Sequence, residues 1–291
     1  MPGTLFVVAT PIGNLEDLTF RALRILREVD VIAAEDTRRT GKLLAHYGIS
    51  RPMISFHEHN QMRETPRVVA RISAGESVAL VTDAGTPGIS DPGAPLVHAA
   101  REAGIAVVPI PGASAVVTAL SASGVSGDGF SFLGFPPATG AARERWFQSL
   151  KDEPRPVVFF EAPHRIDRSI SKIRNIYPYR PIYLFRELTK VHEEQIFIGC
   201  KTDKTSIVRE IGEFTVVLGS NEAQMVNDRN IPDAVVAELF CRLTDLAGVP
   251  DADAFWMVAN HFNLNERDTR KGIKKGRILL KRAAEGLSRQ S

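Results

Sequence analysis

The sequence predicts a two-domain α/β protein that ends in a small, basic helical unit. Over the first 125 residues, short β-rich apolar runs alternate with amphipathic stretches, which is typical of a parallel sheet covered by helices. After Phe130 strand signals outnumber helix signals, which indicates a mixed α+β unit. After Ile231 strand signals disappear and a helical spacing remains. We therefore expect domains at 1–130 and 131–225, followed by a helical unit at 230–291.

In the first domain each short apolar run precedes an amphipathic stretch, as a parallel sheet with helical crossovers requires. The expected strands are LFVVAT (5–10), VDVIAA (29–34), VALVT (78–82) and AVVPI (106–110). The expected helices are Thr19–Glu28, Thr40–His46, Met62–Ile72, Ala94–Ala103 and Ser114–Ala122, the last with Ser114 as a natural N-cap.

The segment GFPPATGAARERW (134–146) is rich in Pro, Gly and small residues, which predicts a linker. The second domain is then expected to hold one helix at about 165–176 and four strands: PVVFFE (156–161), IYLFRE (182–187), EQIFIG (194–199) and EFTVVLG (213–219). The end of the chain resembles a small helix-turn-helix, with a turn at Asn263 and a cap at Asn265.

Composition excludes several classes of protein. A chain of 291 residues with 44% hydrophobic and 24% charged residues is ordinary for a globular protein. Cys200 and Cys241 are too few for a disulfide scaffold and fit a reducing cytoplasm. The apolar run 5–9 is too short for a signal peptide or a spanning helix. We expect a cytoplasmic protein without membrane attachment.

Charge is distributed unevenly along the chain. Residues 267–289 contain nine Lys and Arg against Asp268 and Glu285, a net charge of +7, while the whole chain carries only +2. The remainder is therefore acidic. Such an asymmetry is expected when one end of a protein meets a polyanion such as RNA, although a solvated amphipathic helix is the alternative.

Three loops rich in Gly and Pro follow predicted strands, where open α/β sheets bind ligands. The segments are VATPIGN after the first strand, VTDAGTPGISDPG after the third and PGASA after the fourth. A loop that only turns rarely needs three glycines and two aspartates, so the second segment favours a wrapped small molecule. The first segment alone is equally compatible with an ordinary turn.

Motifs for other cofactors are missing. No GxGxxG follows the first strand, and Gly41-Lys42 lacks the rest of a phosphate-binding loop, which disfavours nicotinamide cofactors and nucleoside triphosphates. HEEQ at 192–195 does not form the HExxH zinc pattern. We predict no metal.

Several segments in order resemble the ribosomal RNA small subunit methyltransferase I family of the tetrapyrrole-methylase superfamily. They are VATPIGNLEDLTFRAL, EDTRRTGKLL, SFHEHN, VTDAGTPGISDPG, PGASA, EAPHRI, RELTKVHEE and GEFTVVLG. Tetrapyrrole methylases read SGDP where this chain reads AGTP, so Thr86 favours the RNA branch.

The resemblance implies a tetrapyrrole-methylase-like fold, a cytoplasmic homodimer and S-adenosyl-L-methionine as cofactor in a cleft between the domains. It implies 2′-O-methylation of a cytidine ribose in the decoding region of 16S rRNA, presented as naked RNA or as the small ribosomal subunit. The matching cofactor-cleft positions are Thr10, Pro11, Gly13, Asp83, Ala84, Gly85, Thr86, Pro87, Gly112, Ala113, Ser114 and Ala115.

A ribose hydroxyl is a poor nucleophile at neutral pH, so a group that accepts its proton would help the transfer. The candidates are Asp36, Glu35, His57 and Asp83. Each has a structural alternative: Asp36 is also a fitting cap for a helix that starts near Thr37, and His57 a loop hydrogen-bonding group.

Basic residues near the cleft and in the tail are candidates for RNA contacts, with domain-stabilising ion pairs as the alternative. They are Arg38, Arg39, Arg165, Arg186, Lys190, Arg267, Arg270, Lys271, Lys274 and Lys275. Two other functions stay open: a porphyrinoid methylase, which has no use for a basic helical unit, and a helix-turn-helix regulator, which does not need a two-domain cleft.

Overall fold

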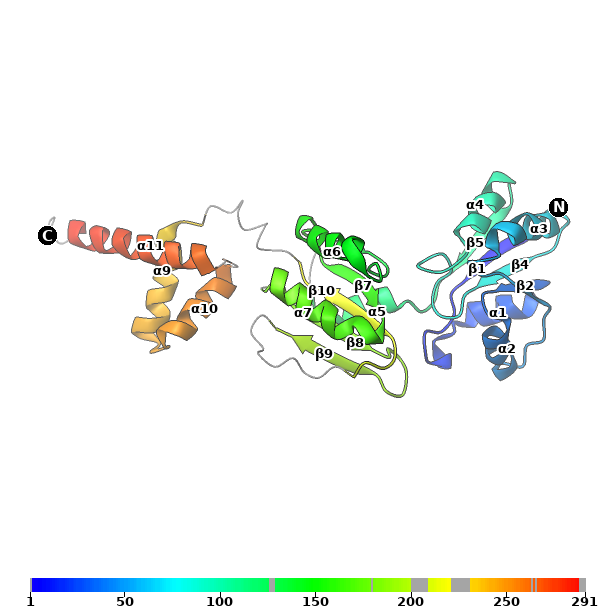
Figure 1. The fold of residues 1–291 in the computed structure, drawn as a ribbon, viewed down its shortest axis with the longest axis horizontal. Coiled ribbons are helices and arrows are strands. Elements are labelled where there is room, and N and C mark those ends of the chain that lie inside the picture. The colour runs from blue at the N-terminus through cyan, green and yellow to red at the C-terminus, as the bar shows by residue number, and fades with distance from the viewer. Residues whose placement is uncertain are drawn as a thin grey trace.

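The computed structural model describes residues 2–125, 129–178, 180–199, 209–220, 231–262, 264 and 266–287. In Figure 1 these residues form three parts in a row, with the N-terminal domain at one end, a second sheet domain in the middle and a helical unit at the other end. Within the described ranges, no helix is both long enough and apolar enough to span a bilayer.

The N-terminal domain contains five strands, namely β1 (Thr4–Val8), β2 (Val31–Ala34), β3 (Met53–Ser55), β4 (Val78–Val81) and β5 (Ala106–Ile110). They form one parallel sheet in the order β3-β2-β4-β1-β5. Every residue of β2 and β4 is buried, which explains their continuous apolar sequences. The predicted parallel α/β fold is confirmed.

Helices cover both faces of this sheet, so each face has its own apolar core. The helices are α1 (Phe20–Glu28), α2 (Thr37–His46), α3 (Gln61–Ser73) and α4 (Ala94–Glu102), with a short turn η1 (Leu15–Asp17) after β1. Leu26 of α1 and Leu44 of α2 pack on one face, and Val68 of α3 and Leu96 of α4 on the other.

Two elements of this domain differ from the sequence prediction. The strand β3 was not predicted, because three residues are too few to produce a recognisable pattern. The helix α2 begins three residues earlier than the predicted Thr40. Its first turn TRR is polar and carries no apolar periodicity, so only the cap marks the true start.

The second domain is a mixed sheet, as predicted, but it has five strands where four were expected, because the two-residue strand β6 is too short to leave a pattern in the sequence. Its strands are β6 (Ser131–Phe132), β7 (Val157–Glu161), β8 (Ile182–Arg186), β9 (Glu194–Ile198) and β10 (Phe214–Leu218), in the order β6-β7-β10-β8-β9. Only the β6–β7 pair is parallel. Its helical elements are α6 (Gly140–Ser149), η2 (Leu150–Asp152), η3 (Pro163–Arg165) and α7 (Ile166–Ile176).

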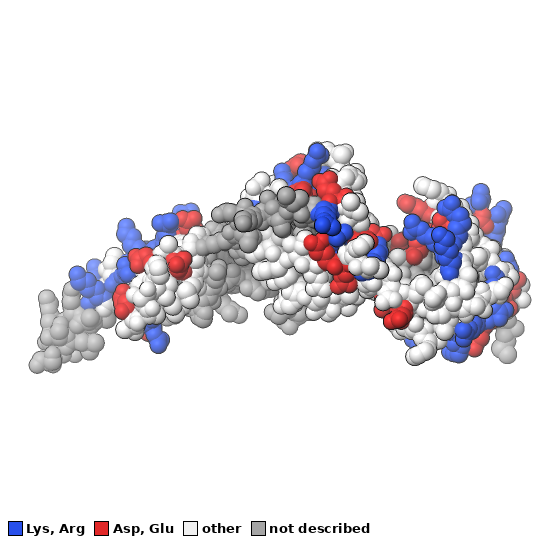
Figure 2. Space-filling model, turned by 90° about the horizontal axis from the view of Figure 1, so that it is seen from below, with Lys and Arg blue, Asp and Glu red and all other residues white. Residues whose placement is uncertain are grey.

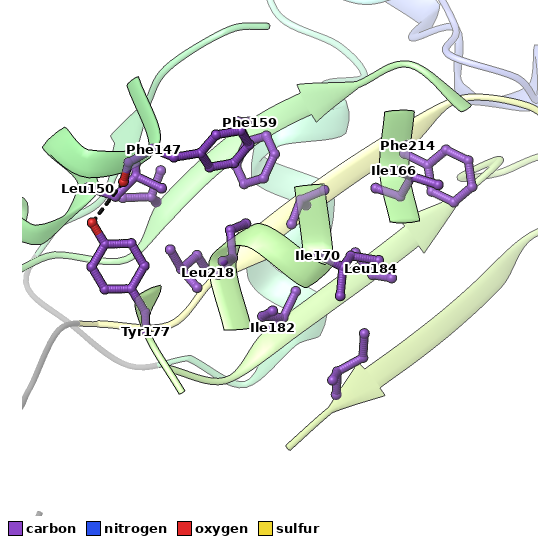
Figure 3. Packing of buried hydrophobic residues seen from close by; sticks show 14 residues of the cluster. Phe147, Leu150, Phe159, Ile166, Ile170, Tyr177, Ile182, Leu184, Phe214 and Leu218 are labelled. Carbon is purple, nitrogen blue, oxygen red and sulfur yellow. Dashed lines mark hydrogen bonds between the residues drawn. The ribbon is translucent and has the colours of Figure 1, made fainter. Parts of the chain in front are cut away.

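One face of this sheet packs against α6 and α7 (Figure 3). Phe147 of α6 and Ile170 of α7 meet Phe159 and Leu184 of the sheet, and the Tyr177 hydroxyl donates to the Phe147 carbonyl over 2.8 Å. The predicted linker at 134–146 is therefore wrong over its second half. The Gly and Ala residues at the start of α6 resemble a linker, while the apolar residues that anchor the helix come only at its end.

The other face is covered by α5 (Ala115–Ser123). Val116 and Ala119 of α5 pack on Val158 and Val217 of the sheet. The chain thus passes from the first sheet to the second between β5 and α5, earlier than the boundary predicted at residue 130. Because α5 is apolar on most sides, its sequence does not reveal which sheet it covers.

The C-terminal unit contains α9 (Asp233–Cys241), the π-helical turn η5 (Arg242–Leu246), α10 (Asp251–Phe262) and α11 (Glu266–Leu287). Val236, Phe240, Ala254 and Val258 form its core. A side chain at Gly276 would place its Cβ against the carbonyl oxygen of Asp233, so α11 crosses α9 with the two backbones in close approach. The expected turn at Asn263 and cap at Asn265 lie outside the described residues.

Candidate active site

Two loops at the carboxyl end of the first sheet are hydrogen-bonded to each other. The Thr10 amide after β1 donates to the Gly85 carbonyl after β4 over 2.9 Å, and the Gly85 amide donates back over 3.1 Å. The Thr10 hydroxyl also donates to the Thr82 carbonyl over 3.0 Å. Because β5 lies on the other side of β1, its loop joins the same edge. The three loops therefore converge, as the sequence analysis expected.

A cavity of about 370 Å³, termed here the interdomain cavity, lies between these loops and the second domain. Small-molecule sites typically span about 300–1,000 Å³ and combine apolar walls with a few polar groups. The lining residues are Ile12, Ala84–Thr86, Ile89–Asp91, Ser114–Val116, Phe135, Phe160–Pro163 and Gly212–Thr215. Phe135, Phe160 and Ile89 supply apolar surface, while Asp91 and Glu213 supply carboxylates.

A second cavity of about 280 Å³, termed the charged cavity, adjoins it and shares Ile12, Ala84 and Glu213 with it. Cations outnumber carboxylates along its wall. Its charged lining residues are Arg39, Lys42, Asp83, Lys190 and Glu213.

The predicted cofactor residues fall into three groups. Those that line the interdomain cavity are Ala84, Gly85, Thr86, Ser114 and Ala115. Those that line the charged cavity are Thr10, Pro11, Gly13, Asp83 and again Ala84. Gly112 and Ala113 line a third hollow, and Pro87 is buried. Ser114 stands at the N-cap of α5, although its side chain makes no capping bond.

Gly13 lies where the first domain contacts the second, and there is no room for a side chain. A Cβ at this position would overlap Cγ of Lys190 and lie 2.8 Å from the Thr189 hydroxyl. The loop after β1 therefore touches the turn after β8 directly, and a larger residue would push the domains apart. Thr189 itself has a positive φ of 65°, a conformation that L-residues rarely adopt.

The predicted catalytic carboxylates Glu35 and Asp83 brace the loops after β2 and β4. The Asp36 amide donates to Asp83 over 3.0 Å, and the Asp83 amide donates to Glu35 over 3.1 Å. Arg39 lies 3.2 Å from the second Asp83 oxygen. Both carboxylates thus have structural partners.

Asp36 caps α2, so the structural alternative for this residue is confirmed. Its carboxylate accepts from the Arg38 amide over 2.8 Å and pairs with the Arg38 guanidinium at 2.7 Å. These hydrogen bonds from Arg38 hold the pKa of Asp36 well below its ordinary value. A carboxylate of such low basicity is a poor proton acceptor.

His57 follows the edge strand β3 and lines neither cavity. Its amide donates to Asn60 over 2.8 Å. Its buried Nδ1 has no hydrogen-bond partner within the described ranges. A catalytic role for His57 stays a prediction without support from this geometry.

Asp91 is the titratable residue that the catalytic candidates omitted. It is half-buried in the wall of the interdomain cavity, next to Ser90, whose φ is 63°. Burial, together with the negative charges of Glu35 and Asp83, raises the pKa of Asp91 to about 7. The sequence shows Asp91 before Pro92 in a Gly-rich loop, where a turn residue is the ordinary interpretation.

Glu161 at the end of β7 is fully buried between two arginines. Its carboxylate accepts from Arg143 over 2.6 Å, Arg165 over 2.8 Å and the Ser169 hydroxyl over 2.6 Å. Burial alone would raise the pKa of Glu161, but the hydrogen bonds from Ser169 and Arg143 lower it below its ordinary value. Glu161 therefore stays ionised and fixes both arginines.

The predicted RNA-binding residues near the cleft are all paired. Arg38 and Arg39 pair with Asp36 and Asp83 but remain largely exposed. The other pairs are Arg165 with Glu161, buried Arg186 with Glu194 at 2.8 Å, and Lys190 with Glu187 at 2.8 Å and Glu213 at 3.0 Å. Burial leaves Arg186 the least accessible of these five.

The tail residues lie exposed along α11. Figure 2 shows Lys and Arg gathered on the helical unit, at the end of the molecule away from the N-terminal domain. The exposed predicted residues are Arg267, Arg270, Lys271, Lys274 and Lys275. Arg270 pairs with Glu266 on the same helix at 2.7 Å. Within the ranges that the structure covers, no cluster of His, Cys, Asp and Glu could hold a metal ion.

A parallel α/β domain and a mixed second domain that enclose a ligand-sized cavity at their junction define a class of two-domain methylases. The family model "Tetrapyrrole (Corrin/Porphyrin) Methylases" matches residues 4–200. The methyltransferase CobJ superposes with a TM-score of 0.57 at 17% identity, over 75% of this chain and 95% of that chain. Uroporphyrin-III C-methyltransferase from Thermus thermophilus, complexed with S-adenosylhomocysteine, gives a TM-score of 0.52 at 18% identity, over 75% and 97%.

Curated relatives narrow this class. Ribosomal RNA small subunit methyltransferase I of Pseudomonas aeruginosa is 52% identical over 192 residues, covering 66% of this chain and 68% of the relative. That of Haemophilus influenzae is 43% identical over 242 residues, covering 81% and 86%. The chain therefore belongs to the ribosomal RNA small subunit methyltransferase I family of tetrapyrrole methylases, and the predicted family is confirmed.

Proposed function

We propose that this chain transfers a methyl group from S-adenosylmethionine to the 2′-oxygen of a cytidine ribose in the decoding region of 16S rRNA. The observation that carries the proposal is the identity of 43–52% to small-subunit rRNA methyltransferases over 66–81% of the chain. The interdomain cavity and the basic α11 agree with such a cofactor and such a substrate.

The interdomain cavity has the size and the wall for S-adenosylmethionine. Phe135, Phe160 and Ile89 offer apolar surface to an adenine ring, and the loop at 84–86 offers backbone at a place where Gly85 adopts a φ of 85°. Carboxylates in the wall suit a cationic ligand. When bound, the cofactor supplies a sulfonium-activated methyl group, and a solved fold relative is complexed with S-adenosylhomocysteine.

The protein's own contribution is position and proton transfer. A displacement of this kind requires the acceptor oxygen about 3 Å from the methyl carbon, in line with the bond that breaks. Asp91 lines the cavity with a pKa of about 7, so a large share is ionised at neutral pH and can accept the hydroxyl proton. We assign this step to Asp91 ahead of Glu35, Asp36 and Asp83, whose carboxylates are engaged in bracing or capping.

The RNA would approach through the charged cavity while α11 holds the flanking strand. Arg39, Lys42 and Lys190 lie beside the wall that the two cavities share. The exposed Lys271, Lys274 and Lys275 provide phosphate contacts that position the substrate without reading its sequence.

We also propose that the protein works as a cytoplasmic homodimer. Phe20 is 93% exposed and Val117 is 56% exposed, and their chain neighbours Thr19 and Thr118 line one hollow. Exposed apolar groups that border a common hollow support a partner surface there. A second copy of the chain is the partner that the family resemblance implies.

The test is transfer of label from S-adenosyl-[methyl-³H]methionine to small subunits and to naked 16S rRNA from cells that lack this protein. Nuclease digestion and mass analysis locate the methyl group. We expect one 2′-O-methylcytidine. Label on a base, or transfer to a porphyrinoid with none to either RNA substrate, would contradict the proposal.

A further inference from the structure

A separate cavity of about 460 Å³ lies in the second domain, between the start of α6 and the start of α7. It shares no lining residue with the interdomain or the charged cavity. Four of its lining side chains are cationic. The lining residues are Ala138, Thr139, Arg143, Glu144, Phe147, His164, Arg165, Arg168 and Lys172. We term it the arginine cavity.

The positive charge of this cavity is only partly neutralised. Arg143 and Arg165 share the single carboxylate of Glu161, and Lys172 pairs with Glu144. Arg168 has no ion-pair partner within the described ranges and is exposed. The four cations therefore face two carboxylates, which leaves two positive charges in excess.

Two arginines of this cavity are fixed in position by the rest of the domain, as a binding site for a ligand requires. Arg143 and Arg165 are only 13% and 18% exposed, and buried Glu161 anchors both. Arg165 donates to Glu161 through Nε, which leaves its two terminal nitrogens without a partner in the described part of the chain. A rigid guanidinium fork of this kind matches two oxygens of a phosphate. Thr139, the N-cap residue of α6, lines the same cavity without making a capping bond, so the helix start adds its partial positive charge.

The arginine cavity lies directly behind the wall of the interdomain cavity. Pro163 lines the interdomain cavity, and the next residue, His164, lines the arginine cavity. Glu161 lies in the wall of the interdomain cavity, and its carboxylate anchors two arginines of the arginine cavity. The two cavities therefore border the same short segment of chain, residues 161–165 at the end of β7.

We propose that the arginine cavity binds a backbone phosphate of the substrate RNA, next to the nucleotide whose ribose reacts. The inference rests on the proposed function, since an RNA strand supplies both groups. It adds an RNA contact inside the second domain, distinct from the tail on α11.

The test compares the double variant Arg168→Ala/Lys172→Ala with Arg145→Ala, an exposed α6 arginine that does not line the cavity. Binding of a single-stranded fragment of the decoding region is measured by fluorescence anisotropy over a range of KCl concentrations. Two lost phosphate contacts should lower the log-log salt slope by about 1.4 and weaken binding by roughly 10- to 30-fold at 0.1 M salt. Arg145→Ala should change neither, and the affinity for S-adenosylmethionine should stay the same in both variants.

Inorganic phosphate separates an RNA site from a site for small anions. If phosphate raises the melting temperature of the wild type at constant ionic strength, and the double variant loses both this effect and the salt slope, the proposal stands. If phosphate binds while the RNA slope stays unchanged, the cavity is a small-anion site and the RNA assignment is overturned. An unchanged slope without a phosphate effect also overturns it. Methyl transfer by the wild type is assayed in parallel, so failure of the proposed function is seen independently.

Discussion

Two carboxylates in the wall of the interdomain cavity have opposite surroundings. Glu161, at the end of β7, is surrounded by donors, two arginines and a serine hydroxyl, which lower its pKa. Asp91, in the loop after β4, is half-buried near Glu35 and Asp83, and burial with their charges raises its pKa to about 7. One cavity therefore holds a carboxylate that stays ionised and one that exchanges a proton near neutral pH. We infer that Glu161 organises structure and that Asp91 serves chemistry.

The largest expected effect is on catalysis by Asp91→Asn. This variant keeps the size and the polar contacts of the side chain but cannot accept a proton. We expect kcat to fall by about 100- to 10,000-fold. S-adenosylmethionine affinity, measured by calorimetry, should change by only a few fold. Asp152→Asn, an exposed carboxylate far along the chain, is the control and should keep full activity. If Asp91→Asn keeps the wild-type kcat, Asp91 is not the proton acceptor, and Glu35 or Asp83 becomes the candidate.

The sequence predicted these two residues to different degrees. Strands were predictable where both faces are buried, as in β4 and β7, because burial leaves a continuous apolar run. A domain-stabilising ion pair was foreseen as the alternative for Arg165, and the structure gives Glu161 as its partner. Arg143 was not, because it lies eighteen residues away in a segment that reads as a linker.

The role of Asp91 depends on contacts that no local pattern contains. Its neighbours Glu35 and Asp83 follow two different strands, so the raised pKa depends on the strand order β2-β4. Likewise, the predicted cofactor residues separate into two cavities because Ile12 and Ala84 lie between them in the wall. The spacing of residues in the sequence is enough to predict where the loops are. Which residues of a loop line which cavity depends on the three-dimensional fold and could not be predicted.

The next effect in size is on stability. Glu161→Gln leaves Arg143 and Arg165 buried without their counter-charge, which we expect to cost roughly 3–5 kcal/mol of unfolding free energy. Urea unfolding followed by circular dichroism measures it. Glu144→Gln removes an exposed carboxylate from the same domain and should lower the free energy of unfolding much less. Equal losses in the two variants would show that Glu161 has no special structural role.

The pH dependence of the reaction should follow Asp91. Because its pKa is about 7, the fraction able to accept a proton rises tenfold per pH unit below that value and levels off above it. Single-turnover rates between pH 5.5 and 8.5 should show this profile, and Asp91→Asn should lose it. A wild-type rate that is flat across this range would remove Asp91 from the mechanism.

The two carboxylates should also give opposite pH slopes of stability. The folded-state pKa of Asp91 lies above its unfolded value of 3.8, so the stability contributed by this group is present at low pH and is lost as the pH rises towards about 7. The folded-state pKa of Glu161 is lowered, so its contribution is present above its unfolded value of 4.5 and is lost as the pH falls. Urea unfolding from pH 2.5 to 8 should show that Asp91→Asn removes the first slope, between pH 4 and 7, and Glu161→Gln the second, below pH 4.5. The reverse assignment would contradict the comparison.

The smallest effect concerns Asp36, a third carboxylate, whose surroundings resemble those of Glu161. Donors from Arg38 surround it and it caps α2, so its low pKa reflects structure and its capacity to accept a proton is small. We expect Asp36→Ala to lower the melting temperature by about 2–4 °C, as loss of a helix cap does in a protein of this size. Asp36→Ser should restore most of the lost melting temperature, because a serine hydroxyl can cap α2 without a negative charge.

Methyl-transfer rates of both Asp36 variants should stay within a few fold of the wild type. A rate that falls 100-fold in Asp36→Ser, while the melting temperature is restored, would show that a capped, arginine-paired carboxylate still acts in catalysis and would break the division between structural and chemical carboxylates.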